Sequence, residues 1–368
     1  MNKAFGLTAI AIFGLTAVTG CASSADSSSQ AVPVPTAAGS SADVIYATFH
    51  GGKAPGVNTV YGYSATGTVD TNVIQNSPNA PLDEARGMAF DSGGNFYVNS
   101  AYKNASQINR YTPLSGGGYG NGITYAPSSL TAGLNHPYGL AVHKSGDLLV
   151  TSQDSMVSTR FSTASNTQAS VVPTGSAWAT NKAVPPGTWA PAVSDNVAAS
   201  AGGIVTPRDV KVVGDTMYVA DSTGYQVKAY NLATGGAFMG VTLDLSKTSP
   251  QGGPTGLAVS PDGNYLYVGA QGTNNVLAVA VNGGSCSSGC VSTQVIGSNQ
   301  GSAVLSHPAG IATTTQNGKL VLYVASQNPG NGVINQYVMS NDTTVQTPSL
   351  FVSNLPDTPE QLLAVPTS

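Results

Sequence analysis

The feature that most constrains this chain is a repeat. Five segments align by eye, at residues 84–111, 136–161, 206–230, 253–281 and 307–338. Each has an apolar strand, a Gly/Asp/Asn turn, a second strand rich in Tyr, Leu and Val, another turn and a third strand. Short alternating strands between regularly spaced turns predict an all-β fold. Because the unit recurs about every 50 residues and leaves room for a fourth strand, it predicts the blades of a β-propeller.

The two ends of the repeat region predict a sixth blade. Residues 43–63 read as the second and third strands of a blade that lacks its first strand, and residues 359–365 align with the first strand at 137–142. A last strand that completes the first blade closes the ring and removes exposed sheet edges. We therefore expect an all-β, six-bladed β-propeller over residues 43–368, closed by a C-terminal strand that completes the first blade.

The repeat can be compared with known families. The stretch GLAVSPDGNYLYVG (256–269) and the openings of the form His/Thr-Pro-x-Gly/Asp-Leu/Ile/Val resemble NHL-type and YVTN-type propeller repeats. The resemblance covers essentially residues 43–368. It implies the fold, whereas function has to be argued from the site, because such scaffolds carry many unrelated activities.

The first 42 residues predict export and a lipid anchor. Residues 1–20 hold a short charged start and an apolar, small-residue run that is too short to span a membrane comfortably, as in a signal peptide. The run ends in Val-Thr-Gly-Cys21, which resembles the bacterial lipobox, whose cysteine is lipidated. Residues 21–42, rich in Ser, Ala and Pro, predict a flexible tether. By resemblance to the lipoprotein sorting rule, Ala22 favours the outer membrane of the bacterial cell envelope.

Composition narrows the possible partners. Only 8% of residues are charged and 44 are glycine, which argues against a coiled coil, a nucleic-acid binder or a polybasic membrane patch. Cys286 and Cys290 lie in GGSCSSGC, and in an oxidising compartment this spacing favours a loop-closing disulfide. It is a weak metal signal, because a closed zinc site needs four ligands.

Two histidines open repeats and raise the question of a metal site. His136 and His307 precede the prolines of the third and sixth blades and should face each other across the axis. The NHL relatives include an amidating lyase whose zinc histidines follow the proline, where this chain has Tyr138 and Ala309. The other blades offer no third histidine near this place, which holds Ala85, Thr206 and Gly253. A catalytic zinc needs three protein ligands. We therefore expect the two histidines to have a structural role at the start of their repeats, and we expect no metal and no cofactor.

The variable residue between the proline and the glycine is more informative. Around the ring this position holds Glu360, Arg86, Tyr138, Arg208, Thr255 and Ala309. First strands line the channel of a propeller and start near one mouth. Lactonase-like propellers hold a divalent cation there with Glu, Asn and Asp, a pattern that only Glu360 matches. Neighbouring arginines would also repel a cation. We therefore expect no cation-dependent lactonase mechanism.

Two interpretations of the arginines stay open. In the first, Glu360 pairs with Arg86, and Arg208 pairs with Asp209 or Glu84, as ordinary ion pairs of a wet channel. In the second, Arg86, Arg208 and Tyr138 present donors to an anionic or carbohydrate-like ligand.

An insertion is the other candidate site. Gly139 and Asp209 lie 70 residues apart, and the extra stretch at 172–203 carries Trp178 and Trp189, the only tryptophans of the chain. Long loops in compact domains are often functional, and tryptophan is a typical anchor for partners or sugars. Alternatively, both indoles fold back over the edge of the blade.

These observations favour a non-catalytic role. The sequence has no Gly-x-Ser-x-Gly elbow, no glycine-rich phosphate loop and no zinc-protease signature. We expect a lipid-anchored propeller that binds a protein or glycan partner through one channel mouth and the insertion. The alternative is a lactonase- or lyase-like enzyme that uses Glu360 and Tyr138, with Arg86 and Arg208 beside them.

Overall fold

The structure is a computed structural model whose described residues all belong to one compact unit, Pro35–Ser368. It describes residues 43–51, 58–102, 106–115, 117–127, 134–162, 170–171, 188–189, 203–234, 237–327, 330 and 332–365. The predicted signal peptide, Cys21, the whole tether at 21–42 and Trp178 lie outside these ranges and stay predictions.

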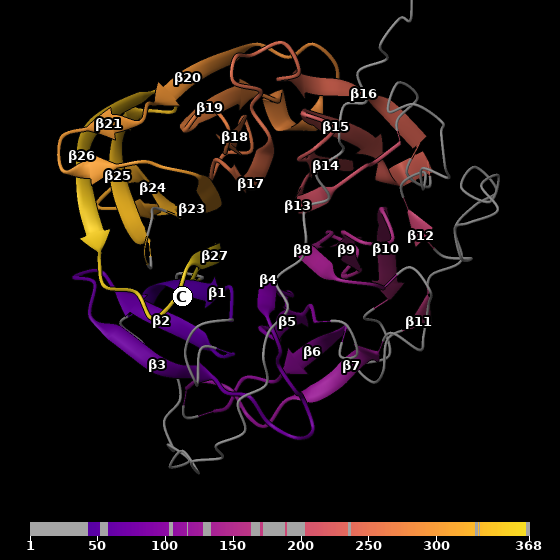
Figure 1. Cartoon of the computed structure of the whole chain (residues 1–368). Helices are drawn as coiled ribbons and strands as arrows, with labels where there is room; N and C mark the ends of the chain where they lie inside the picture. The colour runs from indigo at the N-terminus through magenta and orange to yellow at the C-terminus, as the bar shows by residue number, and fades with distance from the viewer. Residues whose placement is uncertain are drawn as a thin grey trace, which may run out of the picture. The chain divides into compact units, whose positions relative to one another are not determined.

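Six sheets form the six predicted blades (Figure 1). The strand order within each sheet follows the chain, except that β27 precedes β1 in the first and β12 pairs with β10 in the third. The first blade consists of β27 (Pro359–Ala364), β1 (Asp43–Phe49), β2 (Val60–Ser64) and β3 (Val69–Ile74). The second consists of β4 (Ala85–Phe90), β5 (Phe96–Ser100), β6 (Gln107–Tyr111) and β7 (Ile123–Pro127). The third has β8 (Pro137–Val142), β9 (Leu148–Ser152), β10 (Val157–Ser162) and the short β11 (Ser170–Val171) and β12 (Thr188–Trp189).

The remaining blades are regular four-stranded meanders. The fourth has β13 (Pro207–Val213), β14 (Thr216–Asp221), β15 (Gln226–Asn231) and β16 (Ala237–Asp244). The fifth has β17 (Pro254–Val259), β18 (Tyr265–Ala270), β19 (Asn275–Ala280) and β20 (Ser292–Ile296). The sixth has β23 (Pro308–Gln316), β24 (Lys319–Ser326), β25 (Val333–Asn341) and β26 (Thr344–Val352), and a small hairpin of β21 (Asn299–Gln300) and β22 (Ala303–Val304) precedes it.

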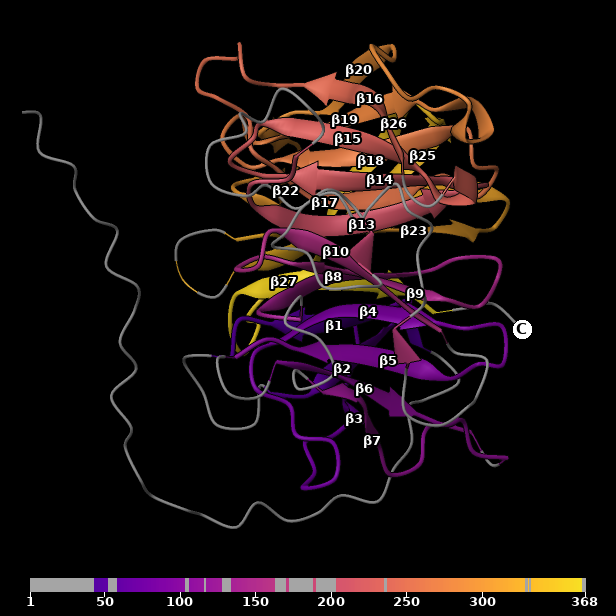
Figure 2. The same ribbon diagram turned by 90° about the vertical axis from the view of Figure 1, so that its right-hand side faces the viewer.

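The ring closes as the sequence predicts. The inner strands contact one another in the cyclic order β27, β4, β8, β13, β17, β23 and back to β27, and they surround the axis in Figure 1. β27 pairs antiparallel with β1, with Tyr46 opposite Leu363, so the two strands lie side by side in Figures 1 and 2. The C-terminal strand therefore takes the place of the first strand that residues 43–63 lack.

The core lies between the blades. Six clusters of buried apolar side chains each join two neighbouring blades. Between the fourth and fifth blades, for example, Tyr218 and Val227 pack with Leu257, Leu266 and Val268. Because every blade is covered on both faces, inner strands such as β8 are buried along almost their whole length. Each fully buried side chain of this size contributes about 1.5–3 kcal/mol to folding.

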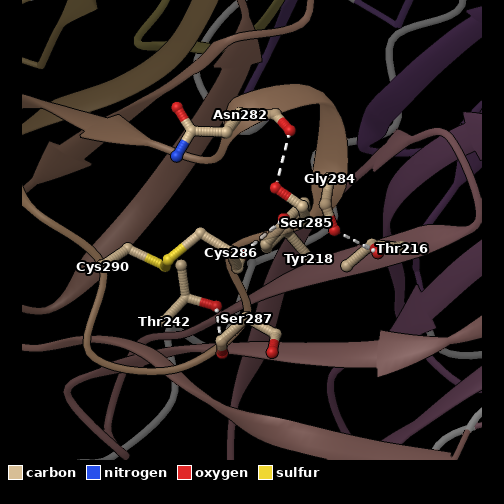
Figure 3. Close-up of a disulfide and its surroundings, with 9 residues drawn as sticks. All are labelled: Thr216, Tyr218, Thr242, Asn282, Gly284, Ser285, Cys286, Ser287 and Cys290. Atoms are coloured by element: carbon tan, nitrogen blue, oxygen red, sulfur yellow. Dashed lines mark hydrogen bonds between the residues drawn. A yellow bond between two sulfur atoms is a disulfide. The ribbon is translucent and has the colours of Figure 1, made fainter.

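A disulfide-bonded loop joins the fifth blade to the fourth. Cys286 and Cys290 are bonded to each other in the connection between β19 and β20, directly after the 3-10 helix η5 (Asn282–Gly284). In Figure 3, Thr216 donates a hydrogen bond to the carbonyl oxygen of Gly284 at 2.7 Å. Tyr218 and Thr242 donate to the carbonyl oxygens of Cys286 and Ser287 at 2.7 and 3.0 Å. The loop is thus docked on a neighbouring blade through its backbone carbonyls.

Helix is scarce in the described part of the chain. Besides η5 it contains η4 (Leu232–Thr234), another 3-10 turn of three residues. None of the described helices is long and apolar enough to cross a bilayer.

Candidate ligand site at one mouth of the channel

The six variable residues of the repeat occupy one structural position. Each is the second residue of an inner strand, namely Glu360 in β27, Arg86 in β4, Tyr138 in β8, Arg208 in β13, Thr255 in β17 and Ala309 in β23. Five of them line one cavity of about 390 Å³. The sixth, Arg86, contacts the cavity residues Glu360 and Tyr138. The alignment of the openings thus identifies side chains that converge in space.

The shape of the cavity follows from side-chain size. Thr255 and Ala309 are short residues on the neighbouring fifth and sixth blades, whereas the other four positions carry long side chains. Thr255 also turns its hydroxyl toward the backbone, donating to the carbonyl oxygen of Pro308 at 2.6 Å. Space therefore remains on the side of these two blades. The cavity is lined by His50, Tyr138, Arg208, Thr255, Gln271, Ala309, Gln327, Thr358 and Glu360.

Glu360 is the centre of a buried polar network. Nη1 of Arg86 lies 2.7 Å from its Oε1, and Nδ1 of His50 lies 2.8 Å from the same oxygen. The hydroxyl of Tyr138 donates to the other oxygen, Oε2. Burial alone would raise the pKa of Glu360, but the charge of Arg86 and the bonds from His50 and Tyr138 outweigh it and lower that pKa to about 2. Glu360 is consequently a carboxylate at every physiological pH.

Two partners of Glu360, Arg86 and Tyr138, are fixed in their charge states as well. Arg86 is 2% exposed and also contacts Oε2 of Glu84 at 2.8 Å. Burial would lower the pKa of Arg86, but the carboxylate of Glu360 and its other neighbours reverse the effect and raise it. Burial, together with the negative charge of Glu360, raises the pKa of Tyr138 to about 12. The predicted pairing of Glu360 with Arg86 is confirmed.

Arg208 differs from Arg86 although the two occupy equivalent positions. Its guanidinium carbon lies 4.7 Å from the centroid of the Tyr138 ring, a cation–π contact. Within the described residues it makes no ion pair, and its buried Nε has no hydrogen-bond partner. Both acids expected for it are engaged elsewhere. Asp209 contacts Nζ of Lys211 at 2.9 Å and accepts from the amide of Leu257, and Glu84 pairs with Arg86. The predicted pairing of Arg208 with either acid is wrong.

A second ring of residues at this mouth was missed in the sequence. His50, Gln271 and Gln327 each follow the second strand of a blade, directly after β1, β18 and β24. Nε2 of Gln271 donates to Oε1 of Gln327 at 3.2 Å, and Nε2 of Gln327 donates to the carbonyl oxygen of Pro359 at 3.0 Å. The shared signal was visible in the repeats as TFH, GAQ and ASQ. It becomes meaningful only once the end of the second strand is known to reach the same mouth as the start of the first.

The two histidines that open repeats share a left-handed backbone conformation. His136 and His307 have left-handed φ values of 53° and 51°, and Glu84, rather than Ala85, is their counterpart in the second blade with a φ of 52°. Nδ1 of His136 lies 3.3 Å from Asp154, and burial lowers the pKa of His136. Nδ1 of His307 lies 3.1 Å from the hydroxyl of Ser306. No group of three or more His, Cys, Asp or Glu side chains in the described ranges could hold a metal ion.

The insertion is described only in part. β12 pairs with β10, with Trp189 opposite Ser158 and Thr188 opposite Thr159. The backbone at Trp189 thus extends the edge of the third blade, as in the interpretation that places the insertion over this edge. The side chain of Trp189 and the whole of Trp178 lie outside the described residues, so their part in binding stays a prediction.

Comparison with known proteins concerns the fold. No family model matches the chain, and no curated protein matches its sequence. Among solved structures, an inactive virginiamycin B lyase from Staphylococcus aureus with quinupristin has a TM-score of 0.50 at 11% identity, covering 87% of this chain and 88% of the other. A nidogen–laminin complex has 0.55 at 13%, covering 88% and 97%. A putative 6-phosphogluconolactonase from Bacteroides fragilis has 0.53 at 15%, covering 89% and 99%. These likenesses establish a six-bladed propeller. They do not distinguish a lyase, a lactonase or a binding protein.

Proposed function

We propose that the protein is a binding propeller that takes a small polar ligand into the cavity at this mouth and does not transform it. The cavity has the size of small-molecule sites. Its lining combines one guanidinium, one carboxylate, two side-chain amides, one imidazole, three hydroxyl-bearing residues and the apolar Ala309. Such a mixture fixes the orientation of a ligand through a few polar contacts.

The observation that carries this proposal is the engagement of Glu360, whose two carboxylate oxygens are held by Arg86, His50 and Tyr138. A general acid or base works best when its pKa lies near the operating pH. The pKa of Glu360 is lowered to about 2 and that of Tyr138 is raised to about 12, so both are far from neutrality. Both are also engaged with each other. The two residues that an enzyme would need in the alternative interpretation are therefore arranged as a support for the cavity wall.

One contact favours the enzyme alternative. His50 lines the cavity, its side chain is 49% exposed, and its Nδ1 can donate to Oε1 of Glu360. A carboxylate that orients an imidazole in this way leaves Nε2 as a possible general base. A lactonase- or lyase-like activity would then depend on His50, with Glu360 as the positioning residue.

A retention experiment separates these possibilities. The purified domain is dialysed against a mixture of small metabolites, and the molecules it retains are identified by mass spectrometry. We expect retained molecules in unchanged form, and their loss in Ala309→Trp, which fills the floor of the cavity. His50→Gln should still retain them unchanged. Conversion of a retained molecule by the wild-type domain, abolished in His50→Gln, would establish the enzyme instead. Equal retention by Ala309→Trp would place binding elsewhere.

We further propose that the propeller is displayed from the bacterial envelope through a lipid on Cys21, as the resemblance of residues 18–21 to a lipobox suggests. Cys21→Ser should move the protein from the membrane fraction to the soluble fraction. Unchanged fractionation would contradict the anchor.

A protein or glycan partner for the insertion belongs to the same proposal. Deleting residues 174–200 should leave the thermal midpoint of the domain nearly unchanged while reducing recovery of that partner. A collapse of the fold would show that the insertion is structural.

A further inference from the structure

We infer that the ligand of this cavity carries a single carboxylate, and that Arg208 is the residue that binds it. The inference rests on the proposed function and names the class of ligand. The two arginines at this mouth differ in their partners. Arg86 forms ion pairs with Glu360 and Glu84, whereas Arg208 lines the cavity with no acidic partner in the described part of the chain.

Arg208 is prepared for an anion. Its guanidinium carbon lies 4.7 Å from the centroid of the Tyr138 ring, and Tyr138 is itself held by its bond to Glu360, so this contact restrains the Arg208 side chain. The buried Nε of Arg208 has no hydrogen-bond partner, as is also true of Arg86, so what distinguishes Arg208 is its lack of an acidic partner. A guanidinium presents parallel N–H donors that match the two oxygens of a carboxylate. A ligand carboxylate would therefore give Arg208 the acidic partner that the described part of the chain does not supply.

Local charge pairing favours a monoanion. The charges of the two guanidinium groups, Arg86 and Arg208, and of the two carboxylates, Glu84 and Glu360, sum to zero at this mouth. Arg86 contacts both carboxylates, so Arg208 is the cation of this set that has no acidic partner. A monocarboxylate would pair with Arg208 and leave the mouth with one net negative charge. A dianionic phosphate ester would bring a second negative charge into a cavity that Glu360 also lines, and that repulsion is little screened in a partly buried site.

The remainder of the ligand is polar and uncharged. Beyond Arg208 in the ring, the fifth and sixth blades contribute Gln271 and Gln327 to the wall, and their amides both donate and accept. Oε1 of Gln327 accepts from Gln271 and its Nε2 donates to the backbone of Pro359, so this pair is held in one orientation. Hydroxyl or amide groups on the ligand would complete these bonds.

The chain offers a direct probe, because it contains only four arginines: Arg86, Arg110, Arg160 and Arg208. The Nε resonances of ¹⁵N-labelled arginine can be assigned with single Arg→Lys variants. The probes are acetate, its uncharged isostere acetamide, and methyl phosphate, each titrated at constant ionic strength and about pH 7.5, where methyl phosphate is a dianion. Arg160, whose Nε donates to Asp147 at 2.7 Å, is the internal control.

We expect acetate to shift the Arg208 signal saturably, with a dissociation constant on the order of 10 mM for so small a ligand. Acetamide should leave the signal in place, methyl phosphate should bind at least several-fold more weakly than acetate, and Arg160 should not move. An Arg208 signal that acetate does not shift, or that acetamide shifts equally, would overturn the carboxylate site. Tighter binding of methyl phosphate than of acetate would contradict the preference of the site for a monoanion.

The retention experiment distinguishes failure of this inference from failure of the proposed function. If Arg208→Gln retains the same molecules as the wild-type domain, binding stands and the carboxylate assignment is wrong. If no molecule is retained but acetate still shifts Arg208, the anion site stands without the proposed role. In both cases the thermal midpoint of Arg208→Gln verifies that the variant is folded.

Discussion

At the scale of single residues, the repeat places two arginines at equivalent positions and gives them different tasks. Arg86 is buried and forms ion pairs with two carboxylates, whereas Arg208 contacts the ring of Tyr138 and lines a cavity. The difference arises from neighbours, because the second blade adjoins Glu360 and carries Glu84, while the acid beside Arg208 is turned toward Lys211. Position in the repeat therefore decides where a side chain lies, and the adjacent blades decide what it does.

The lowered pKa of Glu360 predicts a pH-dependent stability. A carboxyl group with a folded pKa of about 2, against an ordinary value of 4.5, stabilises the fold above the unfolded pKa and loses this contribution as pH falls toward the folded pKa. The whole shift corresponds to roughly 3 kcal/mol. We expect the difference in unfolding free energy between wild type and Glu360→Gln to be constant above about pH 5 and to shrink between about pH 4.5 and 2. Denaturant titrations over this range measure it, and a difference independent of pH would contradict the ionised Glu360.

At the scale of elements, the inner strands approach one another so closely that a methyl group does not fit. A Cβ on Gly256 in β17 would lie 1.8 Å from the carbonyl oxygen of Ala309 in β23, the next inner strand. The glycine of the repeat is therefore needed for the packing of neighbouring blades, and it also brings Thr255 and Ala309 together on the cavity floor.

Gly256→Ala should accordingly destabilise the domain by about 3 kcal/mol, since the clash involves backbone on both sides. The matched control is Gly93→Ala, in an exposed turn where the nearest atom to the new Cβ is a side-chain oxygen at 3.3 Å. Thermal or denaturant unfolding of both variants tests the point. Equal stability of the two would show that the inner strands can separate without cost.

Part of the fold and part of the candidate site could be predicted from the sequence. Strand order, the number of blades and the convergence of Glu360, Arg86 and Tyr138 follow from periodicity, because a repeat fixes the backbone position of each aligned residue. The role of His50 does not follow, because it lies after a strand of the incomplete first blade, where no whole repeat exists for alignment. The lack of an ion pair at Arg208 was not predictable either. It arises because Asp209 contacts Lys211 and the amide of Leu257, and the sequence does not show such side-chain contacts.

At the scale of the whole molecule, the chain is a closed ring in which the last strand holds the first blade. β27 pairs with β1, contacts β23 and β4, and carries Glu360. The closing strand thus supplies both the closure of the fold and the centre of the polar network. Without it, β1 would become an exposed edge facing the channel.

Truncation after Thr358 should therefore remove more stability than a domain of this kind typically has, about 5–15 kcal/mol, and yield aggregated or unfolded protein. The control moves residues 359–365 in front of residue 43 with a short linker, so that the first blade becomes a continuous meander like the others. Circular dichroism and size-exclusion chromatography should show that this permuted chain is folded and monodisperse. A folded truncation, or a permuted chain that does not fold, would contradict the role given to β27.

The central claim is that the ring uses one of its mouth arginines for structure and keeps the other for a ligand. The most direct test compares the unfolding free energies of Arg86→Gln and Arg208→Gln at neutral pH. Removing Arg86 leaves Glu360 buried without its main partner and should cost about 3–5 kcal/mol. Removing Arg208 breaks no ion pair of the described residues and loses only its contact with the Tyr138 ring, so it should cost no more than about 1 kcal/mol. Equal losses in the two variants would show that Arg208 is a structural residue and that the cavity has no cation reserved for a ligand.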